Sequence, residues 1–289
     1  MNSPTGPQDE NCYCYKYPHP AMTADCVIFG FDGQKLKLLL VERGVDPYKG
    51  CWALPGGFMK IDESIEHTAR RELREETGLH NVYLQQFKVY SRPDRDPRER
   101  VVTVAFIALV RPDAYNVIGG DDAARAMWFD ESMLPPLAFD HAEIIREARE
   151  YLKEILKLRP VAFELLNQVF TINELQTVYE VINRASYDRR NFMRTAIDSK
   201  VITEVEGQRA RTGGRMAKLF TRTTTTFISH ASASASIISS SRSFLHAFGV
   251  LAPKKAQEQQ TALKKEELLN EEAKEQSKDS TKGLFDFDF

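Results

Sequence analysis

Hydrophobic residues in the first 160 positions follow two spacings, one typical of strands and one typical of helices. Apolar stretches of strand length lie between turn residues, and the Asp32-Gly33 pair separates the first two as a hairpin turn would. We predict strands at Thr23–Phe31, Lys35–Gly44, Trp52–Leu54, Phe58–Ile61, Tyr83–Ser91, Val101–Val110 and Ala126–Phe129. These stretches indicate a sheet.

Two segments have the spacing of a helix. In Ser64–Thr77 the apolar residues Ile65, Ala69 and Leu73 recur every four positions, and Gly78 supplies a stop signal. A longer helix is predicted at Ala142–Lys157, with Pro160 ending the helical segment. Strands with helices in the middle and at the end predict an α/β (α+β) fold, in which a mixed sheet is sandwiched between helices.

After Pro160 the pattern changes to short helices followed by a hairpin. Thr171 and Glu174 form a capping box in sequence, which predicts a helix over the INELQTVYEVI segment. Ser186 or Asp188 opens a second helix, and two strands follow at Val201–Gly207 and Arg215–Arg222 around a basic, glycine-containing loop. Helix, helix and hairpin in this order predict a winged helix-turn-helix.

The two ends of the chain lack these patterns. Residues 1–19 form a polar leader, and residues 225–289 begin with a low-complexity stretch of Thr, Ser and Ala. We therefore expect a flexible leader at 1–19, a first domain at 20–158, a winged helix-turn-helix domain at 159–224 and a disordered tail at 225–289. A solvated helix over 254–278 is the alternative for part of the tail, to which no function is assigned.

Composition narrows the class of protein. No stretch approaches the roughly 20 apolar residues of a membrane helix, and the N-terminus lacks a secretory signal, so we expect a cytoplasmic protein. The four cysteines lack the spacing of a zinc site and are expected to be reduced thiols. The formal net charge of -2 is unevenly distributed, since residues 1–158 hold 20 basic and 25 acidic residues while 159–222 hold 11 and 7. This asymmetry indicates two modules with different partners.

Three glutamates in the middle helix carry the first candidate chemistry. Glu72, Glu75 and Glu76 stand at i, i+3 and i+4, so their side chains project from one side of the helix. Like charges at this spacing destabilise a helix, and a hard divalent cation such as Mg²⁺ or Mn²⁺ relieves the repulsion. A solvated acidic face paired with neighbouring arginines is the alternative.

The residues around these glutamates decide between the two interpretations. The segment from Gly57 to Leu79 reads G-x5-E-x7-R-E-U-x-E-E-x-G-U, where U is aliphatic, with Glu63 and Arg71 at their required places. This is the Nudix box, and residues 20–158 resemble Nudix hydrolases of the ADP-ribose pyrophosphatase type, including the WALPGGF segment at Trp52–Phe58. The resemblance implies a Nudix α/β/α sandwich that hydrolyses a nucleoside diphosphate-linked substrate.

The resemblance also implies roles for individual residues. Glu72, Glu75 and Glu76 would bind the metal and act in catalysis, with Arg71 orienting them and Glu63 supporting the helix. Gly56 and Gly57 would let the backbone approach the metal and the diphosphate. The general base in this family often lies outside the box, and its candidates here, which stay unranked, are Asp122, Glu131 and Asp140.

An arginine-rich segment between two predicted strands bears on the substrate. SRPDRDPRERVV contains Arg92, Arg95, Arg98 and Arg100, and guanidinium groups suit phosphate oxygens. A solvated basic turn is the alternative. The R-D-P-R run, Arg95 to Arg98, resembles one in relatives that handle ADP-ribose, which favours Arg95 and Arg98 as ligand-binding residues.

The basic second module predicts a nucleic-acid partner. Phe192 and Ile197 are expected to face inward in the second helix, leaving Arg189, Arg190 and Arg194 on the outside, with Arg215 in the wing. This charge is typical of a surface for phosphate backbone, although a solvated basic face is the alternative. The module resembles the winged helix of Nudix-related transcriptional regulators, which implies binding to double-stranded DNA as a homodimer.

Two functions follow from these observations. The first is a Mg²⁺-dependent hydrolase (Mn²⁺ is possible) that cleaves ADP-ribose to AMP and ribose 5-phosphate and carries a DNA-binding winged helix. The second is a metabolite-sensing regulator with little or no turnover, because many such regulators carry a degenerate box. This chain retains every carboxylate of the box.

Overall fold

The computed structural model describes residues 16–115, 123–212 and 215–223, which form two compact units. The first unit comprises Met1–Gly30 and Lys37–Arg149, and the second comprises Phe31–Leu36 and Glu150–Phe289. The predicted tail and most of the predicted leader lie outside the described residues. Within those residues no helix is long and apolar enough to cross a membrane.

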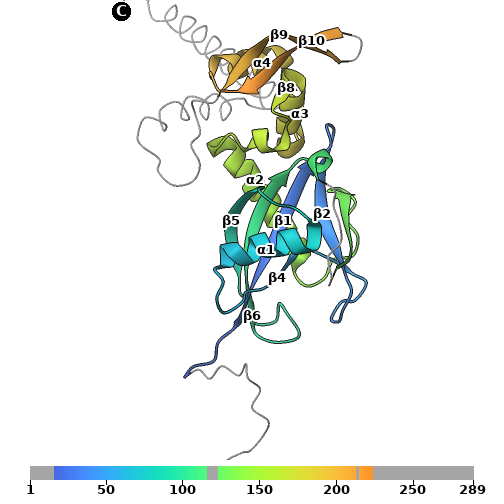
Figure 1. Ribbon diagram of the computed structural model, residues 1–289, viewed down its shortest axis with the longest axis vertical. Helices are drawn as coiled ribbons and strands as arrows, with labels where there is room; N and C mark the ends of the chain where they lie inside the picture. The colour runs from blue at the N-terminus through green and yellow to red at the C-terminus, as the bar shows by residue number, and fades with distance from the viewer. Residues whose placement is uncertain (1–15, 116–122, 213–214, 224–289) are drawn as a thin grey trace, which may run out of the picture. The chain divides into compact units, whose positions relative to one another are not determined.

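A seven-stranded sheet forms the centre of the first unit (Figure 1). Its strands are β1 (Ala21–Phe31), β2 (Leu36–Arg43), β3 (Trp52–Ala53), β4 (Gly56–Phe58), β5 (Tyr83–Tyr90), β6 (Val101–Val110) and β7 (Ala123–Asp130). The main order is β3-β2-β1-β6-β5, with β4 paired to β1 and β7 paired to β2. Because β1 and β6 run parallel whereas β5 and β6 run antiparallel, the sheet is mixed, as predicted.

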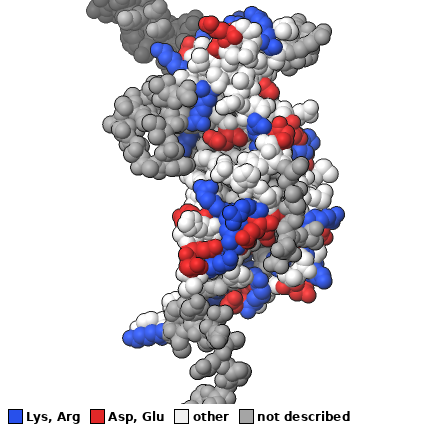
Figure 2. Space-filling view, in the orientation of Figure 1, with Lys and Arg blue, Asp and Glu red and all other residues white. Residues whose placement is uncertain are grey.

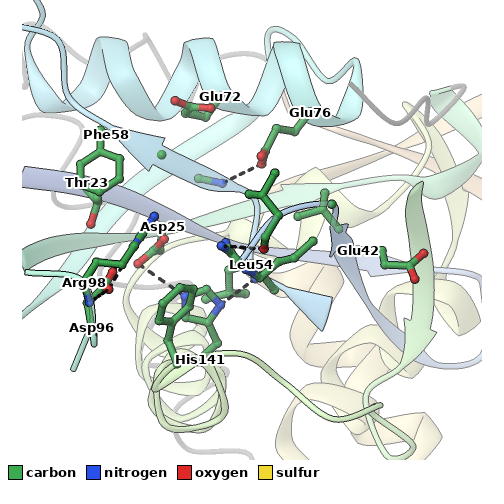
Figure 3. Close-up of a pocket in the computed structure, with 18 of the residues that line it drawn as sticks. Thr23, Asp25, Glu42, Leu54, Phe58, Glu72, Glu76, Asp96, Arg98 and His141 are labelled. Carbon is green, nitrogen blue, oxygen red and sulfur yellow. Dashed lines mark hydrogen bonds and ion pairs between the residues drawn. The ribbon is translucent and has the colours of Figure 1, made fainter. Parts of the chain in front are cut away.

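Both faces of strands β1, β2 and β6 are buried, which explains why these long strands are apolar. Cys26 and Ile28 pack with Leu73 of helix α1 (Ile65–Thr77) in one core cluster. The alternating positions Val27 and Phe29, which point to the opposite face, are equally buried. Helix α2 (His141–Leu158) begins on the side of the sheet away from α1 (Figure 3). The predicted α/β/α layering of this unit is therefore confirmed.

Helix α1 begins and ends where the sequence predicts. The Ser64 side chain accepts a hydrogen bond from the backbone N–H of His67, and Gly78 ends the helix in the left-handed conformation with φ 75°. Ile65, Ala69 and Leu73 lie on its inner side, as expected.

The strand predicted at Phe58–Ile61 is wrong, because β4 lies earlier, at Gly56–Phe58. It pairs antiparallel with Thr23–Asp25 of β1. A Cβ on Gly56 would overlap the carbonyl oxygen of Ala24, so only glycine allows this approach of the two backbones. Two 3-10 turns, η1 (Pro112–Ala114) and η2 (Val161–Leu165), were not predicted.

The second unit contains the predicted two helices and hairpin. Helix α3 (Ile172–Asn183) starts at the Thr171–Glu174 capping box, and helix α4 (Arg189–Asp198) starts at Asp188, one of its two predicted caps. The sheet order is β8-β10-β9, from β8 (Val169–Thr171), β9 (Ile202–Thr212) and β10 (Arg215–Arg222). β8 was not predicted, and β9 extends through most of the segment that we expected to be a loop.

Candidate functional site

Arg71 is the centre of an ion-pair network on α1. Its Nε lies 2.6 Å from Glu63 Oε1, and its Nη1 lies 2.6 Å from Glu72 Oε1 and 3.1 Å from Glu75 Oε2. Its Nη2 donates to the carbonyl oxygen of Phe58 at 3.0 Å. These hydrogen bonds raise the pKa of Arg71 and lower the pKa of Glu63 to about 2. A guanidinium therefore compensates the charge of three box glutamates.

Two box glutamates lie against the glycines of β4 (Figure 3). Glu76 Oε2 accepts a hydrogen bond from the backbone N–H of Gly56 at 2.9 Å. A Cβ on Gly57 would overlap the carboxylate of Glu72. Burial raises the pKa of Glu72 above its usual range. Gly57 therefore leaves room for the Glu72 carboxylate, and Gly56 holds Glu76 through its backbone N–H.

The residues fit a divalent cation by chemistry, although they are not gathered around one point. Among residues 16–115, 123–212 and 215–223, no three acidic, imidazole or thiol side chains are close enough to hold an ion. Glu72 and Glu76 nevertheless both line the pocket, and glycine keeps Cβ atoms away from the Glu72 carboxylate. The Glu75 side chain is half exposed and accepts a hydrogen bond from Arg71. Hard carboxylate oxygens of this kind are what Mg²⁺ prefers.

The pocket has a volume of about 230 Å³ and is walled by segments far apart in the sequence. One wall comes from α1 and β4, and the others come from β1, the end of β2, the arginine-rich segment and the start of α2 (Figure 3). Its polar and charged lining residues are Thr23, Asp25, Glu42, Arg43, Glu72, Glu76, Arg95, Asp96, Arg98 and His141. Charged groups of both signs thus surround a space next to the box glutamates.

Two arginines and two aromatic rings form one side of this pocket. The guanidinium carbon of Arg43 lies 4.8 Å from the ring centre of Phe139, and that of Arg98 lies 5.5 Å from the same ring. Arg98 also lies 5.1 Å from the ring centre of Phe58. Asp96 orients Arg98 through contacts of 3.0 Å to Nε and 2.7 Å to Nη2. Such planar groups suit a flat or phosphorylated ligand.

The two predicted ligand arginines differ in their surroundings. Arg98 is partly exposed at the pocket, whereas the side chain of Arg95 is only 3% exposed. Arg95 pairs with Asp140 through contacts of 2.8 and 3.0 Å and with Asp25 at 3.4 Å. Because these carboxylates compensate its buried charge, Arg95 fixes the pocket wall, and direct ligand contact by Arg95 stays a prediction.

None of the base candidates lines the pocket within the described part of the chain. Asp140 pairs with Arg95, and Glu131 pairs with Arg149 at 2.7 Å. Asp122 lies outside the described residues. Asp25 and Glu42 line the pocket but were not predicted, because each is a single carboxylate in or at the end of a strand without a motif around it.

His141, the first residue of α2, also lines the pocket and was not predicted. It is buried, its Nδ1 accepts a hydrogen bond from the backbone N–H of Leu54 at 2.9 Å, and its Nε2 lies 3.9 Å from Asp25 Oδ2. Burial lowers the pKa of His141, and the neighbouring Asp25 opposes this effect. The neutral imidazole is therefore part of the folded structure.

We expect this lowered pKa to make folding sensitive to mild acid. As pH falls below the unfolded value of about 6.5, the unfolded chain binds a proton first, so stability declines and continues to decline until the folded pKa is passed. The variant His141→Asn keeps an acceptor near the Nδ1 position without titrating. The free energy of unfolding, measured with denaturant between about pH 7.5 and 5.5, should fall less steeply with decreasing pH in the variant than in the wild type. Equal declines would contradict this role of His141.

The predicted DNA-binding arginines of α4 are all exposed. Arg189 and Arg190 follow the cap residue Asp188, and Arg194 lies one turn further, where its Nη2 donates to Asn191 Oδ1 at 3.3 Å. Arg215 begins β10, and the placement of its side chain lies outside the described residues. The structure thus puts three of the four residues on one short helix.

One expected packing position of α4 is wrong. Phe192 is fully buried, as predicted, but Ile197 is 47% exposed and the buried position belongs to Ala196. The reason is the helical period, because residues four apart lie on one face whereas residues five apart do not.

Taken together, the mixed sheet, the box helix and the two glycines that face its glutamates define a Nudix domain, here followed by a winged helix. Comparison with known proteins agrees on both parts. The family model for the NUDIX domain matches residues 19–148, and the model for the NrtR DNA-binding winged helix domain matches residues 162–221.

Individual relatives combine the same two parts or share one of them. An ADPR responsive transcriptional repressor, NtrR, of Acinetobacter baylyi is 34% identical over 207 residues, which cover 71% of this chain and 82% of the relative. An ADP-ribose pyrophosphatase of Methanocaldococcus jannaschii is 44% identical over 136 residues, covering 45% of this chain and 74% of the relative. The crystal structure of Shewanella oneidensis NrtR complexed with a 27mer DNA is 33% identical, with a TM-score of 0.62, and covers 70% of this chain and 93% of that one. The chain belongs to the Nudix family, in the NrtR group that joins a Nudix domain to a DNA-binding winged helix.

Proposed function

We propose that this protein is a Mg²⁺-dependent Nudix hydrolase that uses one water molecule to split the diphosphate of ADP-ribose, which gives AMP and ribose 5-phosphate. We also propose that its winged helix binds double-stranded DNA. The observation that carries the enzymatic part is the placement of Glu72 and Glu76 at the pocket, where Gly57 leaves room for the Glu72 carboxylate and the backbone N–H of Gly56 donates to Glu76. The similarity to an ADP-ribose pyrophosphatase supports the choice of substrate.

The chain's own residues have separate roles in this proposal. Glu72, Glu75 and Glu76 would hold the metal, and the backbone of Gly56 and Gly57 would lie beside it. Bound metal neutralises diphosphate charge and lowers the pKa of a coordinated water. Arg71 keeps the glutamates oriented through the network described above.

The binding part of the proposal places the ligand along the arginine side of the pocket. Arg98 would contact phosphate or a flat ring, supported by its contacts with Phe58 and Phe139. Arg95 would hold the wall in position from its buried ion pairs. The general base is not assigned.

The second module leads to proposals on assembly and location. We propose a Nudix domain at 20–158 and a winged helix-turn-helix domain at 159–224; the family-model matches to residues 19–148 and 162–221 support the two domains and their order. A winged helix that reads a palindromic operator acts as a dimer, so we propose a homodimer in the cytoplasm, where DNA and nucleotides are both accessible. Arg189, Arg190, Arg194 and Arg215 would form the DNA-binding residues.

A second candidate function has its own support. Arg71 already compensates Glu72 and Glu75, and the described residues contain no ready-made group of three ligands. A site of this kind is also compatible with sensing of ADP-ribose with little or no turnover. The relative described as an ADPR responsive repressor favours sensing as an additional or sole role.

Release of AMP from ADP-ribose separates the two candidates. The full chain is incubated with ADP-ribose and Mg²⁺, and AMP is measured with time. The proposal expects AMP to accumulate and to stop accumulating when a chelator removes the metal. Absence of AMP from the wild type would contradict hydrolysis and favour sensing alone.

A further inference from the structure

Helix α4 of the second unit presents two apolar side chains to solvent. Met193 is 43% exposed and Ile197 is 47% exposed, while Phe192 and Ala196 occupy the buried side. At about 100° per residue, Met193, Ile197, Arg190 and Arg194 all fall within about 100° of the helix circumference. The exposed face of α4 therefore carries apolar side chains next to guanidinium side chains.

The charges around this pair indicate what it contacts. Arg189, Arg190 and Arg194 are exposed, and within the described part of the chain Arg190 forms no ion pair. The helix carries one acidic residue, Asp198, at its last position. An interface with an acidic or purely apolar protein surface does not need both kinds of side chain, whereas the major groove of DNA offers phosphates beside base edges.

We propose that Ile197 and Met193 read the C5 methyl groups of thymines in the major groove, so that the operator carries thymines at fixed positions of each half-site. This inference rests on the proposed DNA binding and goes beyond it by naming residues that determine sequence specificity. The thymine methyl is the apolar group on the major-groove edge of the base pairs, and an aliphatic side chain distinguishes it by burial. The match of residues 162–221 to a DNA-binding winged helix supports duplex DNA as the occupant of this face.

Selection from a randomised duplex pool gives the first test. The full-length wild type is expected to select sites with fixed thymines, and Ile197→Ala or Met193→Ala is expected to lose the preference at some of those thymines while still binding DNA. Val169→Ala is the matched control, because Val169 is an aliphatic residue of the same domain, 39% exposed and outside α4. Identical selected sites for the wild type and both α4 variants would overturn the proposal.

Replacement of each identified dT by dU gives the second test, since uracil pairs like thymine but lacks the methyl. Loss of one buried methyl should weaken binding by the wild type about fourfold. The same replacement should not weaken binding by Ile197→Ala further at the thymine that Ile197 contacts. An equal loss for both proteins, or no loss for either, would overturn the assignment.

Two other outcomes are distinguishable from these. If the wild type binds no duplex at low salt, the proposed DNA-binding function fails, and this inference fails with it. If Ile197→Ala binds and selects DNA like the wild type but changes the oligomeric state measured by sedimentation, the face contacts a second copy of the chain and the thymine proposal is wrong.

Discussion

Replacement of Glu76 by Gln is expected to lower the rate of AMP release from ADP-ribose by on the order of a hundredfold or more, the scale on which one charge-stabilising group acts. The amide removes a negative charge from the proposed metal site. Its remaining oxygen can still accept the hydrogen bond that the backbone N–H of Gly56 donates to Glu76 at 2.9 Å in the wild type. The variant should therefore fold normally and lose catalysis.

Glu66→Gln is the matched control for this variant. Glu66 belongs to the same helix, lies in its first turn and is exposed, away from the pocket. We expect it to retain the turnover of the wild type, and we expect thermal unfolding of both variants to resemble that of the wild type. Undiminished turnover of a folded Glu76→Gln protein would contradict the role of Glu76, and an equal loss in Glu66→Gln would point to a general effect of charge on the helix.

Replacement of both Arg190 and Arg194 by Ala is expected to weaken binding to duplex DNA by about ten- to a hundredfold near 0.15 M salt. Each phosphate contact contributes about 0.9 to the slope of log affinity against log salt, so the slope should fall by about two. Both side chains are exposed on α4, so their loss should leave the fold intact. Titration of a labelled duplex at several salt concentrations measures both effects.

Arg70→Ala with Arg74→Ala supplies the control for net charge. These arginines are also exposed and four residues apart, but they lie on α1 in the Nudix unit, where acidic and basic side chains are interleaved on the surface (Figure 2). DNA binding should be unaffected by this pair. If both double variants bind DNA with equal affinity and equal salt slope, α4 is not the DNA-binding helix.

The parts of the site that the sequence predicts are local. The spacing of Glu72, Glu75 and Glu76, the helix start near Ser64 and the stop at Gly78 all depend on a single helix, whose period fixes relative directions. The roles of Arg71 and Glu63 were implied by the resemblance to the Nudix box, and the structure adds that the two side chains pair at 2.6 Å.

The opposite side of the pocket depends on contacts between distant segments. Arg43, Arg98 and Phe139 come from three segments far apart in the sequence, and no periodicity in the sequence indicates that they meet. Arg95 has the appearance of a surface charge, yet its partners Asp25 and Asp140 stand 70 and 45 positions away and make its burial possible. Only the folded sheet brings these groups together.

Two errors in the prediction have equally specific causes. The strand β4 was placed too late because Gly56 and Gly57 have low strand propensity, although their lack of a Cβ is what allows the pairing with β1. Ile197 was placed inside because it is apolar, although the period of α4 directs it outward. Both exceptions occur at positions to which we assign a function, where local preference and structure most often disagree.

We propose that ADP-ribose is both a substrate of this chain and a signal that changes its DNA binding. The most direct test follows duplex occupancy with time after addition of ADP-ribose and Mg²⁺ to the wild type and to Glu76→Gln. We predict that ADP-ribose changes the occupancy in both proteins, that the change reverses in the wild type as AMP accumulates, and that it persists in the variant. An unchanged occupancy would contradict the signal, and a persistent change in both proteins would contradict hydrolysis.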